Sequence, residues 1–437
     1  MQKPIFNTIL GIIFISSSIA AADHLQKTTQ IDQRPNVIII LADDLGCGDM
    51  SLYDGWIETP RIDKMAREGV RFTDFHSNSS VCSPTRIALM TGRYQQRIGI
   101  VDVIVGYRDK EGLEPSEVTI PGLMKNAGYR TAIFGKWHCG TQLRQNPTNH
   151  GFDEYIGFLI GGSDYHKHGN WMDGTRVKEQ KGYSTHIITD RSVEFIERNK
   201  DNPFFLYVSH AAVHNPYQTP ADTPENRPKD KKQSREQTRA RYRIMLEEFD
   251  KGVGKILDTL RKHNLEENTF VFFFSDNGSV RIGANVRPYR GGKFSNYEGG
   301  HRVPAVARWP GRIKAGWKSD ELIVGMDLLP TIMDIVGVEV PRQRKLDGIS
   351  IKNHLLKQVD LPDRRVFFGY EPKLGTAMRD GHWKMQTKGD VIELYDLSRD
   401  IKETTNIADK YPERTREMKA AIEKWKSEVT SDTTSQR

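Results

Sequence analysis

A cysteine, Cys82, stands in the sequence C-S-P-T-R at the point where a helix is expected to begin. Pro84 and Thr85 suit the first turn of a helix, and the segment 86–94 continues it. A nucleophile at this place would feel the positive end of the helix, and Arg86 follows one turn later. An isolated cysteine is also commonly a small buried apolar side chain, so these residues alone leave both interpretations open.

Other polar side chains that can bind ions or move protons stand at the ends of four apolar runs. The runs lie at residues 36–46, 129–138, 203–214 and 269–278. They end in Asp43, Asp44, Lys136, His138, His210, His214, Asp276 and Asn277. Continuous apolar runs of this length are typical of strands that are buried on both faces. We therefore expect these polar residues at the ends of buried strands.

Helical patterns alternate with these strands. In the segment 242–260, apolar residues recur on one helical face. The segment 59–72 has Pro60 in the first turn of a helix and Gly69 at its end. Alternating strands and helices predict an α/β fold with a mostly parallel sheet and helices on both faces. Because ligands of such sheets gather beyond the carboxyl ends of the strands, we expect the polar residues of the four runs to converge on one site.

The C-terminal part of the chain has a different pattern. Short strand-like pieces fill the segment 366–397, interrupted by Gly381 and Gly389, and a helix with one apolar face follows. This pattern predicts a smaller α+β subdomain, made of an antiparallel sheet and a terminal helix. We expect the catalytic α/β domain over residues 23–355 and this subdomain over residues 356–437.

The N-terminus has the pattern of a secretory signal peptide. Residues 1–22 hold one early lysine, a short apolar core and small residues at the end. The core is too short to span a bilayer, and no later stretch is long and apolar enough. We therefore expect a soluble mature protein that is periplasmic or secreted, with a membrane anchor as the alternative.

Charge and cysteine content add two constraints. The 437-residue chain has a formal net charge of +7 and three cysteines. A modest basic excess suits an anionic substrate. Few cysteines in an exported chain mean that disulfides do not carry the fold, and an odd number leaves at least one thiol unpaired.

Around Cys82 the sequence resembles a known enzyme family. The segment 82–93, C-S-P-T-R followed shortly by L-M-T-G-R, matches the signature of the type I, formylglycine-dependent sulfatases. The resemblance covers nearly the whole mature chain and includes N-V-I-I-I-L-A-D-D-L-G, G-K-W-H-C-G, S-D-N-G and Y-E-G-G-H-R-V-P-A. The overall pattern is similar to bacterial polysaccharide sulfatases of the carrageenan and glycosaminoglycan types. The resemblance implies a fold like that of alkaline phosphatase, in agreement with the sheet expected above.

The resemblance also implies that Cys82 is oxidised after synthesis to formylglycine (3-oxoalanine). A formylglycine-generating or sulfatase-maturing enzyme would do this before folding, because the cysteine is expected to be buried in the cleft. The hydrated aldehyde carries two hydroxyls on one carbon. One hydroxyl can attack sulfur and displace the alcohol, and the other can then lose its proton and expel sulfate.

Family members bind a metal ion through residues that match Asp43, Asp44, Asp276 and Asn277 here, with the side chain made from Cys82 as a further ligand. The four offer hard oxygen atoms, which suit calcium or magnesium better than zinc, and we expect calcium. The metal would bind a sulfate oxygen and help to ionise a hydroxyl of the diol. For either pair alone, a capping or turn role is the alternative.

The remaining positions of the family's site match Arg86, Lys136, His138, His214 and Lys293. Arg86 would hold the diol and balance nearby acids. His138 would take the proton that starts sulfate release, and Lys136 and Lys293 would bind sulfate oxygens. His214, with Lys293, would protonate or stabilise the leaving oxygen. For a lone histidine or lysine, a structural or solvated role is the alternative.

Four further residues are candidates for contacts with a sugar. Asp164 and His166 lie in a cluster of polar and aromatic residues, for which a plain loop is the alternative. His301 and Arg302 follow the Y-E-G-G turn, where we expect them to line the cleft.

The other two cysteines, Cys47 and Cys139, stand where family members often carry an aromatic and an aliphatic residue. Each flanks a segment of the expected site. One hypothesis is a disulfide between them, and the other is two separately packed thiols.

Together these features predict hydrolysis of a sulfate ester by cleavage of the S–O bond, on a sulfated carbohydrate such as carrageenan, with glycosaminoglycans second. One alternative is a phosphate or phosphonate ester hydrolase of the same superfamily. Another is a non-catalytic polyanion-binding protein in which Cys82 is unmodified. We expect no nucleic-acid partner and no membrane association after removal of the signal.

Overall fold

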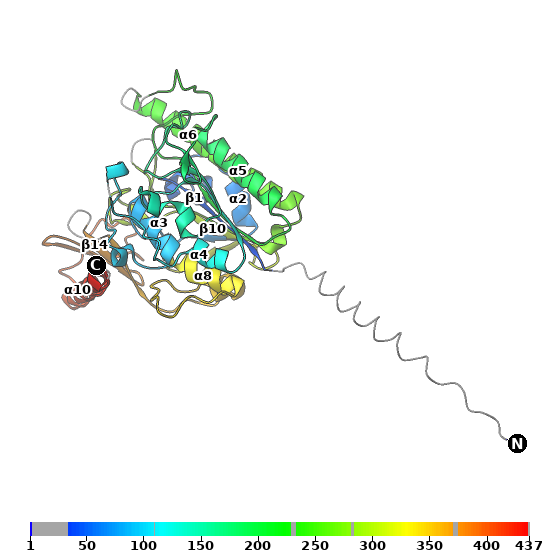
Figure 1. Cartoon of the computed structure of the whole chain (residues 1–437). Coiled ribbons are helices and arrows are strands. Elements are labelled where there is room, and N and C mark those ends of the chain that lie inside the picture. The colour runs from blue at the N-terminus through cyan, green and yellow to red at the C-terminus, as the bar shows by residue number, and fades with distance from the viewer. Residues whose placement is uncertain (2–33, 109, 229–232, 281–283, 370–374, 436–437) are drawn as a thin grey trace.

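A computed structural model gives the fold of the chain (Figure 1). Apart from Met1, the expected signal segment 1–22 lies outside the described residues. The structure describes Met1 and residues 34–435, without residues 109, 229–232, 281–283 and 370–374.

A ten-stranded, mostly parallel sheet forms the centre of the molecule, in the order β11-β2-β10-β9-β1-β8-β4-β5-β6-β7. Strands β9, β1, β8, β4 and β5 run parallel, whereas β10 is antiparallel to β9. The bounds are β1 Asn36–Ala42, β2 Val70–Phe72, β4 Arg130–Lys136, β5 Glu154–Phe158, β6 Met172–Asp173, β7 Arg176–Val177, β8 Phe204–Ser209, β9 Thr269–Ser275, β10 Ala305–Arg308 and β11 Trp317–Ser319.

The four apolar runs of the sequence form β1, β4, β8 and β9, which are neighbours in this sheet. Strand β1 reads N-V-I-I-I-L-A, and all seven residues are buried. Such a strand shows no alternation of polar and apolar residues because helices cover both faces of the sheet. The predicted α/β architecture is confirmed.

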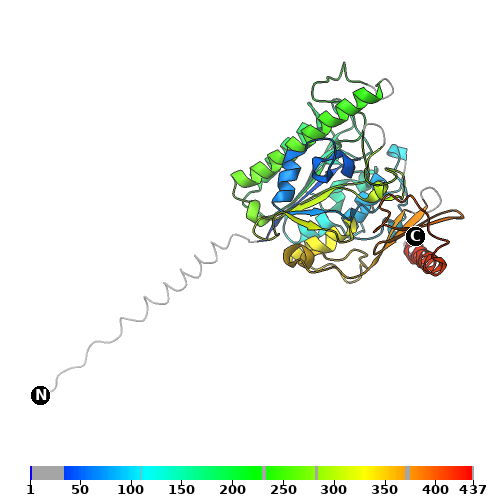
Figure 2. The ribbon, with the colours of Figure 1, turned by 180° about the vertical axis from the view of Figure 1, so that it is seen from behind.

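Two layers of helices sandwich the sheet (Figures 1 and 2). One layer is α2, α5 and α6, with Phe249 of α6 in the core, and the other is α3, α4 and α8, with Leu329 of α8 in the core. The bounds are α2 Pro60–Arg67, α3 Cys82–Thr91, α4 Ile120–Asn126, α5 Ser184–Arg198, α6 Arg235–Lys262 and α8 Leu328–Val336. The helices predicted from residues 59–72 and 242–260 are α2 and part of α6.

The C-terminal sheet has four antiparallel strands in the order β13-β14-β15-β16 (Figure 1). Helix α10 packs against it through buried Met418, Ile422 and Trp425. The predicted antiparallel sheet with a terminal helix is confirmed. The bounds are β13 Arg365–Gly369, β14 Thr376–Asp380, β15 Trp383–Lys388, β16 Val391–Asp396 and α10 Pro412–Ser435.

Helix α9, Lys352–Lys357, crosses the expected domain boundary at residue 355, and the C-terminal sheet begins at Arg365. We therefore propose a division within residues 358–364. A small parallel pair, β3 (Phe75–His76) with β12 (Ile323–Val324), and the short helix α7 (Glu298–His301) complete the elements used below. Among the described residues, no helix combines the length and apolar character needed to cross a bilayer.

Candidate active site

The carboxyl ends of the central strands bring the two acidic pairs together. Ala42, the last residue of β1, is paired with Ser275, the last residue of β9. The residues that follow, Asp43 and Asp276, therefore leave the sheet side by side. The backbone N–H of Asp44 also donates to Asp276 Oδ1 at 3.3 Å.

Three acceptor oxygens at this edge are buried and have no hydrogen-bond partner among the described residues. They are Asp43 Oδ1, Asp44 Oδ2 and Asn277 Oδ1. Buried acceptors are nearly always paired in proteins, and each unpaired one costs about 1–3 kcal/mol. One ligand atom each of Asp43, Cys82 and Asp276 also lie within 4.8 Å of one another. A hard divalent cation suits such a set of oxygens, so the residues fit the metal that was expected here.

Three basic side chains surround these acids. Lys136 Nζ lies 2.5 Å from Asp43 Oδ2, and Lys293 Nζ lies 2.7 Å from Asp44 Oδ1. Arg86 donates from Nε and Nη2 to Asp276 Oδ2 at 2.9 and 2.7 Å. We call this group, Asp43, Asp44, Cys82, Arg86, Lys136, Asp276, Asn277 and Lys293, the strand-end cluster.

The pKa shifts of the acids follow from burial and these charges. Burial acts to raise the pKa of Asp43, but the charges of Lys136, His214 and Arg86 outweigh it and hold this pKa below its ordinary value. Burial and the negative charge of Asp43 raise the pKa of Asp276, in spite of Arg86. The acids are therefore imperfectly neutralised by the side chains alone, which a bound cation would correct.

Cys82 is the first residue of α3 and is only 2% exposed. Burial raises the pKa of its thiol above the ordinary value, although Lys136 and Lys293 act in the opposite direction. The unmodified thiol would therefore be protonated at neutral pH, in spite of its place at the positive end of a helix. An ordinary cysteine here is a poor nucleophile, which agrees with its expected role as the precursor of an aldehyde.

One ring nitrogen of His138 is hydrogen-bonded, and the other has no partner among the described residues. Its Nε2 lies 2.9 Å from the carbonyl oxygen of Ile104, so Nε2 carries the proton and donates it. Its Nδ1 is buried without a partner among the described residues. Burial, followed by the charge of Lys136, lowers the pKa of His138 well below its ordinary value. A neutral imidazole in this tautomer presents a lone pair at Nδ1 that can accept a proton.

His214 lies at the opening of the site, with its side chain 18% exposed. Its Nε2 is 3.7 Å from Asp44 Oδ2, and its Nδ1 is 2.6 Å from the carbonyl oxygen of Asn215. Gly161 and Gly162 lie beside the two histidines. A Cβ at Gly161 would come within 2.8 Å of the His138 ring, so only glycine permits this approach.

Two residues of the site adopt left-handed backbone conformations, Asp44 with φ +62° and His138 with φ +55°. Non-glycine residues occupy this region rarely, and such strain is concentrated at functional sites. Asp44 is the second residue after the end of β1, and His138 is the second residue after the end of β4.

Sequence reasoning missed Ser209, the last residue of β8. Arg86 Nη1 donates to Ser209 Oγ at 2.6 Å, and Ser209 Oγ donates to the carbonyl oxygen of Lys136 at 2.6 Å. The hydroxyl thus joins Arg86 to the end of β4. Its position at the end of an apolar run was the available signal.

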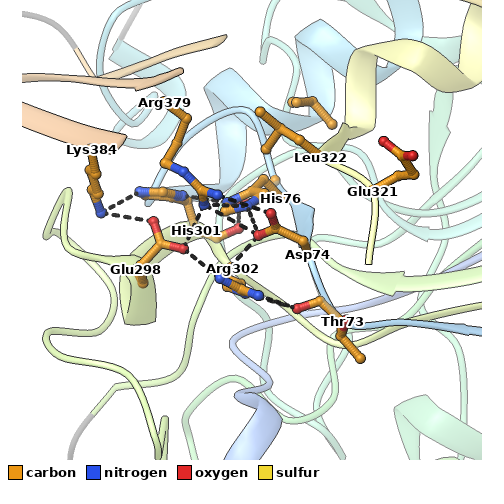
Figure 3. A network of polar contacts seen from close by, with 12 residues as sticks. Thr73, Asp74, His76, Glu298, His301, Arg302, Glu321, Leu322, Arg379 and Lys384 are labelled. Atoms are coloured by element: carbon orange, nitrogen blue, oxygen red, sulfur yellow. Dashed lines mark hydrogen bonds and ion pairs between the residues drawn. The ribbon is translucent and has the colours of Figure 1, made fainter. Parts of the chain in front are cut away.

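His301 and Arg302 lie in a second buried cluster rather than in the cleft (Figure 3). His301 Nδ1 is 2.9 Å from His76 Nδ1, and His301 Nε2 is 3.0 Å from the carbonyl oxygen of Asn296. Arg302 is bound by Asp74, Glu298 and the Thr73 carbonyl. The expected sugar contacts of both residues are therefore wrong, because their side chains turn into the interior. We call Asp74, His76, Glu298, His301, Arg302, Arg379, Lys384 and Glu403 the His76–Glu298 cluster.

Asp164 and His166 are partly buried in their own loop. Asp164 pairs with Arg227 and accepts hydrogen bonds from the backbone of His166 and Lys167. His166 Nε2 lies 2.9 Å from the carbonyl oxygen of Thr219. Their contact with a sugar stays a prediction.

The hypothesis of a disulfide between Cys47 and Cys139 is wrong, because both are free thiols. Cys47 follows β1 and Cys139 follows β4, and β8 lies between these strands. The Cys47 thiol faces the carbonyl of Arg302, whereas Cys139 is packed in the core.

Comparison with known proteins identifies relatives along almost the whole described chain. The sulfatase family matches residues 35–338, and the family described as N-sulphoglucosamine sulphohydrolase, C-terminal, matches residues 292–429. An arylsulfatase of Hemicentrotus pulcherrimus is 37% identical, over 80% of this chain and 67% of that protein. The N-acetylgalactosamine-6-sulfatase of Homo sapiens is 35% identical, over 77% of this chain and 68% of that protein. The crystal structure of Ps i-CgsB in complex with k-i-k-neocarrahexaose has a TM-score of 0.82 and 30% identity, and covers 90% of this chain and 92% of that one.

Proposed function

This chain belongs to the type I sulfatase family and hydrolyses sulfate esters, and we propose that its substrate is a sulfated polysaccharide: a galactan such as carrageenan first, and a glycosaminoglycan second. Two relatives support this substrate class. One solved relative holds a neocarrahexaose, and another relative is named for N-acetylgalactosamine 6-sulfate. Both names refer to sugars with galactose-type rings.

One observation carries the catalytic part of the proposal. One buried oxygen each of Asp43, Asp44 and Asn277 has no hydrogen-bond partner among the described residues. Ligand atoms of Asp43, Cys82 and Asp276 lie within 4.8 Å of one another, and basic side chains pair with the acids. Members of the sulfatase family use a formylglycine and a divalent metal ion. For this chain we propose Ca²⁺, held by the side chains of the strand-end cluster, and formylglycine at position 82.

The bound groups would supply a Lewis acid for a sulfate oxygen and a diol hydroxyl as the nucleophile. The chain's own residues then orient the ester and move its protons. Lys136 and Lys293 bind sulfate oxygens, where negative charge grows as the S–O bond breaks. Each such contact contributes roughly 10²–10³ in rate.

His138 and His214 carry out the proton transfers. His138 accepts a proton at Nδ1, the ring nitrogen that has no partner among the described residues. His214, which is partly exposed at the opening, assists the departing sugar oxygen. Arg86 is fixed by Ser209 and Asp276, so it holds the nucleophile's side chain in one position.

We also propose that residues 1–22 direct export and that a maturing enzyme oxidises Cys82 before the chain folds. The second proposal is supported by burial, since a side chain that is 2% exposed offers no access to another enzyme.

The test is a panel of defined sulfated oligosaccharides, with measurement of released sulfate and of the position that lost it. We expect release from galactose-type rings, and aryl phosphate at matched concentration should be turned over far more slowly. Faster turnover of the phosphate, or sulfate release only from other sugars, would contradict the proposal.

The metal assignment is tested by calorimetric titration of Ca²⁺ into the chelator-treated protein. We expect one site in the wild type and its loss in Asp44→Asn. Glu197→Gln changes an exposed acid that pairs with Lys262, and it should bind Ca²⁺ like the wild type.

A further inference from the structure

Phe294 is an exposed aromatic side chain directly after Lys293. It is 57% exposed and has φ +68°. A bulky residue in the left-handed region is an outlier, and such strain persists only where the surroundings hold it in place. The strain and the exposure together indicate a function for the ring, because burial does not explain either.

The position of Phe294 is fixed beside the strand-end cluster. Its backbone N–H donates to the carbonyl oxygen of Ser80, two residues before Cys82, at 3.0 Å. Lys293 Nζ, which is 2.7 Å from Asp44 Oδ1, lies 5.6 Å from the centre of the Phe294 ring. The ring is therefore next to the side chains that would hold the sulfate.

Phe294 also forms one wall of a cavity of about 310 Å³. The cavity lies between the segment 294–297 and strands β15 and β16 of the C-terminal sheet. Its volume is within the range of small-molecule sites. The residues that the argument uses are Phe294, Tyr297, Gln386, Lys388, Val391 and Glu393.

The cavity walls combine apolar and polar groups. Phe294 and Val391, which is 61% exposed, supply apolar surface. Glu393 accepts hydrogen bonds from Tyr297 at 2.9 Å and from Gln386, and Lys388 is an exposed cation. A sugar ring has an apolar face of C–H groups and an edge of hydroxyls, so it matches such a surface.

We propose that this cavity is a second sugar subsite, which binds the ring next to the one whose sulfate is removed. Phe294 stacks on the apolar face of that ring, Glu393 and Gln386 bind its hydroxyls, and Lys388 faces a sulfate that it carries. The inference rests on the proposed function, and it adds that the enzyme recognises at least two consecutive sugars of a chain.

The subsite is held in place before substrate arrives. Asn296 Nδ2 donates to the carbonyl oxygen of Gly375 at 2.8 Å, which ties the segment 294–297 to the C-terminal sheet. Phe294 is tied to Ser80 on the other side. Little ordering of the loop is therefore needed on binding, which favours affinity.

The experiment compares kcat/KM for a sulfated monosaccharide and for an oligosaccharide with the same sulfated ring. The ratio of the two values measures the advantage of the longer substrate, and it should exceed one in the wild type. Phe294→Ala and Phe294→Gly should both lower this ratio about three- to tenfold, the size expected of one stacking contact. Phe294→Tyr should keep the ratio. Leu143→Ala removes another exposed apolar side chain, outside this cavity, and should also keep the ratio.

Three outcomes would overturn the subsite. In the first, Phe294→Ala and Phe294→Gly change neither the ratio nor the activity on either substrate. In the second, both variants lose activity equally on the two substrates, so the ratio is unchanged. In the third, Phe294→Gly keeps the ratio while Phe294→Ala lowers it. The last two would show that the residue acts through Lys293 or through its backbone. Failure of the proposed function is distinct, since the wild type would then release no sulfate from either substrate.

Discussion

The strand-end cluster and the His76–Glu298 cluster are both buried groups of charged side chains, and Figure 3 shows the second of them. In the second cluster both oxygens of Asp74 and both oxygens of Glu298 have a donor, and Glu403 Oε1, which has no hydrogen-bond partner among the described residues, lies 2.9 Å from Lys384 Nζ. Asp74 is bound by His76, Arg302 and Arg379, and Glu298 is bound by Lys384, Arg302 and Arg379. The strand-end cluster instead leaves three oxygens without a partner among the described residues.

Proximity of ligand atoms does not separate these clusters. His76, Glu298 and His301 approach one another within 4.8 Å, as do Asp43, Cys82 and Asp276. The two clusters differ in how many of their buried oxygens lack a hydrogen-bond partner among the described residues. A cation entering the second cluster would meet acids already paired with Arg379 and Lys384, so we propose the metal only at the strand ends.

The largest expected effect is a loss of catalytic activity without a loss of stability. Cys82→Ala should lower kcat for sulfate release at least about 10⁴-fold, because it removes the nucleophile. The melting temperature should change little, since alanine fits a buried site of this size. Turnover at the wild-type level, with calorimetry showing a folded variant, would end the proposed mechanism.

The second effect belongs to the His76–Glu298 cluster. Glu298→Gln leaves Lys384 and Arg379 without their shared acid, and this should lower the free energy of unfolding by about 3–5 kcal/mol. Urea titration measures it. Glu197→Gln, which breaks the exposed pair with Lys262, should cost no more than about 1 kcal/mol. Equal costs for the two variants would remove the distinction between the clusters.

The third effect tests a cation of the strand-end cluster. Lys293→Met should lower kcat on a sulfated oligosaccharide about 10²–10³-fold, because a donor to the sulfate oxygens is lost. Steady-state kinetics measures it. Lys251→Met changes a lysine whose side chain is 68% exposed and serves as the control. A higher KM with an unchanged kcat would show that Lys293 binds the ground state and the transition state equally, which would contradict the role proposed here.

The smallest effect is the pH dependence of stability. Burial, as the main cause, lowers the pKa of His76 below its ordinary 6.5 and that of His301 well below it. Below about pH 6.5 the unfolded chain therefore binds protons that the folded cluster does not, and stability falls as the pH falls.

For His301 the loss between pH 7.5 and 5.5 should approach about 1.4 kcal/mol, and His76 adds a loss of the same sign. Urea titrations at the two pH values measure it. In His301→Gln the decrease should be smaller than in the wild type. The same decrease in both proteins would show that His301 is not protonated differently in the folded and unfolded chains.

The strand ends could be predicted from sequence because each polar residue directly follows an apolar run. Asp43 and Asp276 are 233 residues apart, yet the buried parallel strands that precede them allow only one arrangement at the sheet edge. The unpaired oxygens could not be predicted, since they depend on the side-chain distances of Lys136 and Lys293.

The wrong predictions relied on closeness in the sequence, whereas the contacts depend on how the helices and strands are arranged in space. His301 follows the loop that carries Lys293, but α7 turns its ring toward His76. Cys47 and Cys139 flank site segments, but their strands are not neighbours. The His76–Glu298 cluster had no local signal at all, because Asp74 and Arg379 meet from opposite ends of the chain.

The His76–Glu298 cluster is made of residues from both parts of the chain, which limits how this protein could be recombined with its relatives. Asp74 and Glu298 precede the proposed division at residues 358–364, whereas Arg379 and Lys384 follow it. A chimera that took its C-terminal sheet from another sulfatase would leave these two buried acids with Arg302 as their shared counter-ion and without Arg379 and Lys384, unless the donor carried basic residues at the facing positions of β14 and β15. The two parts are therefore expected to be exchangeable only as charge-matched sets.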